Sequence, residues 1–410
     1  GDGSDGGGSD GSDGGGSDGS DGGGSDGGST SGGGDSGPFK IGMVQALSGS
    51  VASVGQSAVR GLELARDILN EEGGINGRDI KIYTADTEAT AETGVRRARE
   101  LIEQEGVNVI LGGTTSPTAL AVSQFSTEAN IPYLAGPITP SLTGSECRRT
   151  TFRVAGVNLQ HTNSAHAYNV NQLTDGTRVA GIHPDYSLGR GSWSAFKSTI
   201  QEENSDLEIV AELFPDLGTS DYRNEIQELA SSDVDLIHST LFGSNLVSFI
   251  KQARQNDLFE QIEALTVSGS LLDTTKALGN QTPRMLATIA YYFGFPDTEI
   301  NNQFVDNFAS AHDTRPGLNA QIAYTDTLAI KEAVEKVGSD ASDDIIGGLE
   351  GLEFEGPPGT IRVRPEDHQG IKEAFPSGWT GPIEEAEFHG ISELHPVESQ
   401  NFITEPNCSF

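Results

Sequence analysis

From Phe39 onward, short apolar runs alternate with longer stretches in which apolar residues recur every three or four positions. Such runs are typical of buried strands, and the longer stretches are typical of amphipathic helices. Over residues 58–71, for example, Val59, Leu62 and Leu69 would share one helical face. The alternation of strand and helix favours a parallel sheet with helices on both faces. The pattern predicts strands at 40–47, 79–85, 107–112 and 131–135, and helices at 58–71, 91–105 and 117–128.

The same alternation then starts again, which predicts a second α/β unit. Its last helices, at 301–311 and 320–337, have no sheet of their own, so we expect them to return and cover an existing one. A chain that crosses between two lobes more than once is typical of a hinged clamp. The predicted fold is α/β, with two Rossmann-like lobes built on parallel sheets. We expect the first lobe at 39–157, the second at 158–290, a return to the first at 291–365, and a crossing back towards the second at 366–410.

Residues 1–38 have a different composition from the rest of the chain. They are almost only Gly, Ser and Asp, with an eight-residue unit that repeats from Ser4, Ser12 and Ser20. No apolar side chain precedes Pro38 to offset the entropy of ordering, so we expect a flexible tether. An ordinary disordered terminus is the alternative. The first residue is Gly and not Met, which suggests a removed signal peptide and a lipid anchor before Gly1. We therefore expect an extracellular protein anchored at the cell surface.

Charge narrows the possible partners. Sixty acidic residues face 25 basic ones, for a net charge of −35. Without the eight aspartates of the tether, 52 acids still face the same 25 bases, which is −27. Nucleic acid and anionic membrane surfaces would repel such a protein. An acidic, Lys-poor composition resembles that of proteins from extreme halophiles, in which molar salt screens the self-repulsion. An acidic mesophilic protein is the alternative.

Common enzyme motifs do not occur in the predicted lobes. From Phe39 onward there is no GxSxG nucleophile turn, GxxxxGK[ST] phosphate loop or HExxH zinc motif. His161 and His166 are five residues apart, a spacing that does not align them on one helical face, and we expect His166 on a helix surface. We expect no enzymatic activity, metal or cofactor.

Hydroxyl-rich turns follow three of the predicted strands. Ser48 follows the first strand, Thr115 and Ser116 follow the third, and Gly136 and Thr139 follow the fourth. In open α/β sheets ligands bind at these carboxyl ends, where helix N-termini present free N–H groups. Helix capping is the simpler role for such residues. Three such turns in succession predict one ligand crevice.

Several segments resemble the substrate-binding proteins of ABC importers, in the branched-chain amino acid and amide family of the leucine/isoleucine/valine-binding type. The most specific segment is NEEGGINGR at 70–78, and IGMVQALSG at 41–49, FR at 152–153, KQAR at 251–254 and DHQ at 367–369 also match. The resemblance implies the type I periplasmic-binding-protein fold, in which three crossovers join two lobes that close over a small ligand. It also implies a monomer whose partners are the membrane subunits of an ABC permease.

The family's ligand residues carry over only in part. By resemblance, Ser116 would bind a ligand carboxylate, Gly136 would give backbone contacts, and Phe242 would be an aromatic lid on the second lobe. The sequence departs from the family at other positions. Val54 and Leu188 stand where an aromatic is common, and Ile138 stands where a threonine is common. The expected ligand set is Ser48, Thr115, Ser116, Gly136, Thr139, Leu188, Phe242 and Ser268.

Ser268 leaves the identity of the ligand open. It stands where the family has an acid that pairs with a ligand ammonium, and a buried ammonium without such a partner is costly. Either Asp185 or Asp273 substitutes, or the ligand is not an amino acid. We expect a branched-chain or related amino acid, with an amide, urea-like or carboxylate solute as the alternative, or a sensory role instead of import.

Two cysteines, Cys147 and Cys408, lie far apart in the sequence and outside any metal-binding spacing. In an exported protein they could form one disulfide that would fix the C-terminal tail to the body. The sequence alone leaves this pairing undecided.

Overall fold

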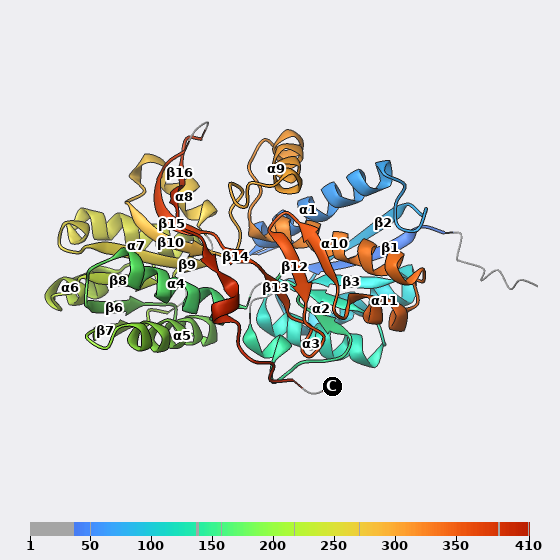
Figure 1. Ribbon diagram of the computed structural model, residues 1–410, viewed down its shortest axis with the longest axis horizontal. Helices are drawn as coiled ribbons and strands as arrows, with labels where there is room; N and C mark the ends of the chain where they lie inside the picture. The colour runs from blue at the N-terminus through green and yellow to red at the C-terminus, as the bar shows by residue number, and fades with distance from the viewer. Residues whose placement is uncertain are drawn as a thin grey trace, which may run out of the picture. The chain divides into compact units, whose positions relative to one another are not determined.

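The computed structural model describes residues 37–49, 51–136, 139–156, 158–216, 218–269, 271–383, 386–408 and 410. The chain divides into two units, Gly1–Asp35 and Ser36–Phe410. The predicted tether therefore lies outside the described residues, except for its last two positions. The second unit contains both predicted lobes (Figure 1).

The first lobe is built on a five-stranded parallel sheet, with the order β2-β1-β3-β4-β5. In the inner strand β1, all residues but Lys40 are buried, which explains why its sequence is mostly apolar and does not alternate. The strands are β1 (Phe39–Gln45), β2 (Ile80–Asp86), β3 (Val109–Gly112), β4 (Tyr133–Ala135) and β5 (Thr151–Phe152). The helices between them are α1 (Ala52–Glu71), α2 (Ala91–Glu100) with the π-turn η1 (Leu101–Glu105), α3 (Ser116–Glu128) and the 3₁₀ turn η2 (Pro140–Thr143).

Later segments of the chain return to this lobe and complete its core. Ile330 and Ala333 pack in one cluster with Leu62 of α1 and Met43 of β1, so this late segment lies in the core of the first lobe. The helices cross closely, because a Cβ at Gly61 would lie 2.1 Å from the Ala320 carbonyl oxygen. These segments are α9 (Glu299–His312), α10 (Leu318–Val337), α11 (Ser342–Leu349), β11 (Glu353–Gly356), β12 (Gly359–Val363) and β13 (Gly370–Lys372).

The second lobe has a seven-stranded sheet with the order β16-β15-β10-β9-β8-β6-β7. Five strands are parallel, and β15 and β16 add antiparallel at one side. The strands are β6 (Arg178–Ile182), β7 (Glu208–Leu213), β8 (Leu236–Ser239), β9 (Ala264–Gly269), β10 (Met285–Ile289), β15 (Ser377–Pro382) and β16 (His389–Leu394). The helical segments are α4 (Leu159–Leu173), α5 (Ser187–Glu203), α6 (Arg223–Ser231), α7 (Gly243–Gln255), η3 (Leu258–Glu260), α8 (Leu272–Leu278) and η4 (Gly279–Gln281).

No bounds were predicted for α4, the helix that carries His166, because its sequence LQHTNSAHAYNVNQL has no apolar stripe. It is nevertheless largely buried, and its polar side chains are hydrogen-bonded within the lobe. The Asn163 amide donates to the Leu159 carbonyl, and the Asn169 amide donates to the Ser377 hydroxyl at 2.6 Å. Satisfying these groups removes most of the cost of burying them.

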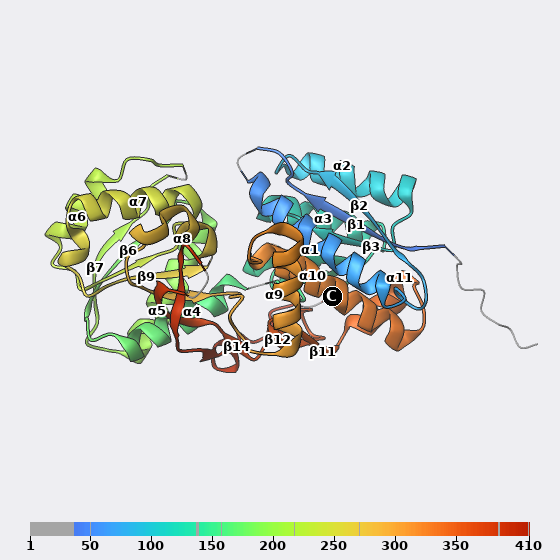
Figure 2. The same ribbon diagram turned by 90° about the horizontal axis from the view of Figure 1, so that it is seen from above.

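Three segments cross between the lobes, at residues 153–158, 290–298 and 364–376 (Figure 2). After β16, strand β17 (Val397–Glu398) pairs with β14 (Ala374–Phe375), and the turn η5 (Ser399–Phe402) leads into the tail. Cys408 in this tail is joined to Cys147 of the first lobe by a disulfide, with the Cα atoms 5.9 Å apart. The pairing that the sequence left open therefore forms, and the tail ends on the first lobe.

None of the helices in the described part of the chain combines the length and the apolarity that crossing a bilayer requires.

Candidate functional site

The loops after β1 and β3 are tied together by hydrogen bonds. The Ala46 amide donates to the Thr114 hydroxyl at 2.8 Å, and the Leu47 amide donates to the Asp86 carboxylate at 2.9 Å. Burial opposes ionisation of Asp86, but hydrogen bonds from the Ser48 side chain and from neighbouring backbone amides keep its pKa below the usual value. Ser48 is thus partly engaged in shaping the loop, although it is exposed.

Thr115 and Ser116 occupy the start of α3, as the sequence predicted. Thr115 is the N-cap residue, and its hydroxyl accepts from the Thr118 amide. Ser116 is the first helical residue and is partly exposed. Among the described residues no hydrogen bond engages its hydroxyl, so this group is available to a ligand beside the positive end of the helix.

Gly136 and Thr139 lie on the loop between β4 and η2. The Gly136 amide donates to the Gly112 carbonyl at 3.1 Å, and a Cβ at Gly136 would have only that oxygen near it, at 3.9 Å. The face of Gly136 is therefore open. The Thr139 hydroxyl lies 3.2 Å from that of Ser141. Ile138, which departs from the family pattern, lies outside the described residues.

The second-lobe candidates lie at the ends of β6, β8 and β9. Leu188 is in the first turn of α5, and Phe242 is the N-cap of α7. Phe242 is 36% exposed, and it is one of four large apolar side chains classed as exposed among the described residues. Ser268 is buried, and its hydroxyl donates to Asn163 at 2.6 Å. Ser268 therefore faces α4. Asp185, one of the two acids that could replace it beside an ammonium, is paired with Arg190 at 2.6 Å.

A pocket of about 200 Å³ lies between α1 of the first lobe and the β9–α8 turn of the second. Residues 289–293 and 314–319 complete its wall. None of the eight expected ligand residues lines it, but Val54 and Asp273 do. The pocket brings together segments that are far apart in the sequence, so no local motif could have indicated it.

The pocket combines cationic and aromatic groups. Lys276, Arg60 and Arg315 line it together with Asp273 among the described residues, and Arg315 is also paired with Asp306 at 4.0 Å. The Lys276 ammonium donates to Thr314 at 2.7 Å, and burial lowers its pKa, which an anionic ligand would counteract. The remaining wall includes the aromatic residues Tyr291, Tyr292, Phe293 and Phe308. This lining suits a small anion with an apolar body.

Three buried histidines lie together in the second lobe. The expectation for His166 was wrong: it has no exposed surface, because the polar helix α4 is packed on the sheet. The rings of His166 and His183 lie 5.0 and 5.2 Å from that of His238. Each Nδ1 pairs with a threonine hydroxyl, and each Nε2 is buried with no hydrogen-bond partner in the described part of the chain. Desolvation lowers the pKa of His166 and His183 to about 3 and that of His238 well below its usual value.

A histidine of this cluster connects two of the loops that precede expected ligand residues. The His183 Nδ1 lies 2.8 Å from the Thr240 hydroxyl, which links the loop before Leu188 to the loop before Phe242. In the described part of the chain, no group of three or more His, Cys, Asp or Glu residues could hold a metal ion.

The chain belongs to the periplasmic binding protein family, whose model matches residues 38–380. A curated relative, the Leu/Ile/Val-binding protein homolog 7 of Brucella abortus, is 26% identical over 326 residues, covering 75% of this chain and 79% of the relative. Such relatives are named as binding proteins and not as enzymes.

Solved structures share the fold. An amino acid ABC transporter substrate-binding protein from Pseudomonas fluorescens has a TM-score of 0.80 and 21% identity, covering 91% of this chain and 99% of its own. A solute-binding protein from Rhodopseudomonas palustris, solved with 3,4-dihydroxybenzoic acid, has a TM-score of 0.77 and 22% identity, covering 88% and 98%. These likenesses confirm the predicted two-lobed fold.

Substituting Ser116 should lower the affinity for the ligand without lowering the stability of the fold. A carboxylate or carbonyl at its hydroxyl and at the α3 N-terminus gains about 2–3 kcal/mol. We therefore expect Ser116→Ala to weaken ligand affinity about 10- to 100-fold in calorimetric titration, with the urea midpoint almost unchanged. The neighbouring Thr115→Ala should instead cost about 1 kcal/mol of stability, because it removes a helix cap. Parent-like affinity in Ser116→Ala would place the ligand elsewhere.

The histidine cluster should make the fold acid-sensitive. Below pH ~6.5 the unfolded chain binds protons that the buried imidazoles do not, so stability falls by about 1.4 kcal/mol per pH unit for each histidine. Burial raises the pKa of Asp326 to about 7. Between pH 6 and 4.5 this carboxyl therefore holds a proton in the folded chain and largely lacks it in the unfolded one, which adds a nearly constant slope of the opposite sign to the dependence of stability on pH. We expect His183→Gln to make the slope of stability between pH 6 and 4.5 shallower by about one proton. The measurement is urea unfolding at fixed salt, with His395→Gln, an exposed site, as the control. Equal slopes in both variants would contradict the assignment.

Proposed function

We propose that this chain is the solute-binding subunit of an ABC importer, which holds a small carboxylate-bearing solute between its lobes and delivers it to a membrane permease. The observation that carries this proposal is the pocket between α1 and the β9–α8 turn, where both lobes contribute cationic groups. The chain would perform no chemistry on its ligand.

Capture would proceed by hinge closure. A ligand that contacts both lobes binds the closed arrangement better than the open one and shifts the population towards it. The three crossovers supply the hinge, and the exposed Phe242 would cover the ligand on closure. Ser116 and the α3 N-terminus do not line this pocket, so they are a second, separate candidate for the ligand contact on the first lobe.

A branched-chain or related amino acid is the first candidate ligand, in line with the names of the curated relatives. A carboxylic acid without an ammonium group is the second. It is favoured because Ser268 replaces the acid expected beside an ammonium and because Lys276 and Arg60 line the pocket. Four solved relatives carry benzoate or a hydroxybenzoate, so this fold accommodates such acids.

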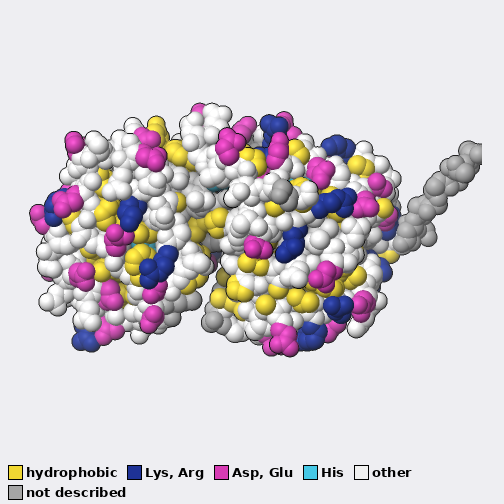
Figure 3. All heavy atoms as spheres, turned by 90° about the horizontal axis from the view of Figure 1, so that it is seen from below, with side chains coloured by type: hydrophobic (Ala, Val, Ile, Leu, Met, Phe, Trp, Pro, Cys, Tyr) yellow, Lys and Arg dark blue, Asp and Glu magenta, His cyan; other side chains and the backbone are white. Residues whose placement is uncertain are grey.

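We also propose an extracellular location with a lipid anchor, a monomeric state and a high-salt habitat. The Gly/Ser/Asp composition of residues 1–38 supports the anchor, since the tether expected from this composition would let a membrane-anchored receptor reach its permease. The charge of −27 on the rest of the chain supports the habitat. On one face of the molecule, acidic side chains are scattered and basic ones are dispersed among them (Figure 3).

A solute panel tests the ligand class. The parent protein is titrated with leucine, valine, benzoate, 4-hydroxybenzoate, acetamide and urea, and small-angle scattering follows its compactness. We expect at least one carboxylate to bind and to reduce the radius of gyration of a monomer, while acetamide and urea do not bind. Binding of no carboxylate would contradict the proposed ligand class. Ligand-induced dimers would favour the sensory alternative.

Salt dependence tests the habitat. Because screening at molar salt removes repulsion among the excess carboxylates, the melting temperature should rise between low and molar NaCl. The measurement is thermal unfolding by circular dichroism from about 0.05 to 3 M salt, a range over which the Debye length falls below about 3 Å. A melting temperature that does not change over this range would refute the high-salt interpretation.

A further inference from the structure

Arg153 is a charged side chain buried at the point where the chain first leaves the first lobe. It has no exposed surface, and it is the largest fully buried side chain among the described residues. Its Nε donates to the Gln369 side-chain oxygen at 2.8 Å, and its Nη1 donates to the Thr139 carbonyl at 2.7 Å. Its Nη2 donates to the Thr143 hydroxyl. One guanidinium thus connects acceptors from two distant segments.

The first of these segments is the loop that carries Gly136 and Thr139. In the described part of this loop, between β4 and β5, the short turn η2 is the regular structure. Arg153 holds it at Thr139 and Thr143, and the disulfide at Cys147 fixes its far end. The position of the two expected ligand residues therefore depends on the contacts that Arg153 and the disulfide make with this loop.

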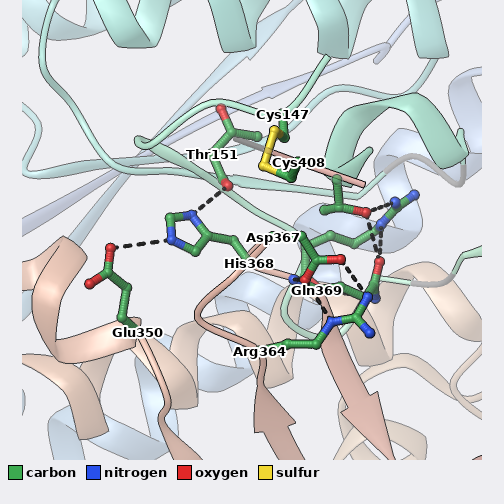
Figure 4. Close-up of a disulfide and its surroundings, with 10 residues drawn as sticks. Cys147, Thr151, Glu350, Arg364, Asp367, His368, Gln369 and Cys408 are labelled. Atoms are coloured by element: carbon green, nitrogen blue, oxygen red, sulfur yellow. Dashed lines mark hydrogen bonds and ion pairs between the residues drawn. A yellow bond between two sulfur atoms is a disulfide. The ribbon is translucent and has the colours of Figure 1, made fainter. Parts of the chain in front are cut away.

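The second segment is the third crossover, at Gln369. The Arg153 amide donates to the His368 carbonyl at 3.0 Å, and the Gly370 amide donates to the Arg153 carbonyl at 2.8 Å. The Thr143 hydroxyl also donates to the Gln369 oxygen at 3.1 Å. Figure 4 shows Gln369 beside Asp367 and Arg364 on this crossover, with the Cys147–Cys408 disulfide nearby. Two of the three hinge segments are thus locked to each other at Arg153.

The charge of Arg153 is costly to bury, and burial lowers its pKa to about 9 against the opposing effect of the Asp367 carboxylate. Asp367, on the third crossover, is itself paired with Arg364. The guanidinium offers something a neutral group cannot, a rigid fork of donors that reaches three acceptors at once.

We propose that Arg153 is a positioning residue that couples the hinge to the ligand loop, so that the arrangement of the crossovers sets the place of Gly136 and Thr139. A change at the third crossover moves Gln369, and through the guanidinium it moves the Thr139 carbonyl. The inference rests on the proposed function, since it names a control of that same site.

The test uses Arg153→Lys in the full chain. A lysine ammonium keeps the charge but cannot hold all three acceptors in their present directions. Without any ligand, amide hydrogen exchange over residues 139–147 should become at least tenfold faster, while that of the second-lobe strand β8 stays as in the parent. Affinity for leucine or benzoate, whichever the parent binds, should fall at least tenfold.

Arg364→Lys is the matched control. Arg364 lies on the third crossover, where its partners among the described residues are Asp367 and the Thr404 carbonyl and not the ligand loop. We expect exchange over 139–147 and affinity to stay within twofold of the parent. Thr143→Val removes one acceptor and little volume. It should change both readouts in the same direction as Arg153→Lys, but by only about threefold. This variant provides the test if Arg153→Lys does not fold.

The possible outcomes distinguish a failure of the positioning role of Arg153 from a failure of the proposed function. If the Arg153 and Thr143 variants lower the melting temperature but leave loop exchange and affinity unchanged, Arg153 is only structural and the inference is wrong. If the parent binds neither leucine nor benzoate, the ligand class fails, while exchange over 139–147 still decides the positioning role.

Discussion

The junction of the first and third crossovers is the constraint on which the rest of the molecule depends. Two separate sheets on one chain need segments that hold them in register, and these two segments are bonded to each other through the backbone of Arg153. They approach so closely that a Cβ at Gly370 would lie 1.8 Å from the Val154 carbonyl oxygen. The second crossover joins them, because the Lys372 ammonium donates to the Ala290 carbonyl. All three crossovers therefore meet in one hydrogen-bonded junction.

Burial has opposite consequences in the two places where polar groups are enclosed. In the second lobe, the enclosed groups are histidines that desolvation keeps neutral, so they pack among aromatic rings such as Phe196 at little electrostatic cost. At the junction the enclosed groups are Arg153 and Lys372, and burial lowers the pKa of Lys372 to about 7. The lobe interior avoids charge, whereas the junction uses strong donors to fix the crossovers.

Net charge and local charge also differ. The body carries −27, yet the pocket between the lobes gathers Lys276, Arg60 and Arg315. In low salt the distant carboxylates would repel an anionic solute, while screening would leave only the nearby cations to act on it. Acidity of the surface and recognition of an anion are therefore compatible, provided that the ionic strength is high. The same screening that would stabilise the fold would also favour capture of an anion.

The sequence by itself determined the elements whose pattern is local: the alternating strands and helices of both lobes, and Ser116 at the start of α3. It missed helix α4, because burial there is carried by hydrogen-bonded amides and not by an apolar stripe. It placed His166 on a surface for the same reason. Only the tertiary structure decided the Cys147–Cys408 pairing, the orientation of Ser268 towards Asn163, the pocket at Lys276 and the hydrogen bonds from the Arg153 guanidinium to Gln369, Thr139 and Thr143. Each of these joins residues whose proximity is set by sheet order and chain crossing, and no spacing along the chain encodes that proximity.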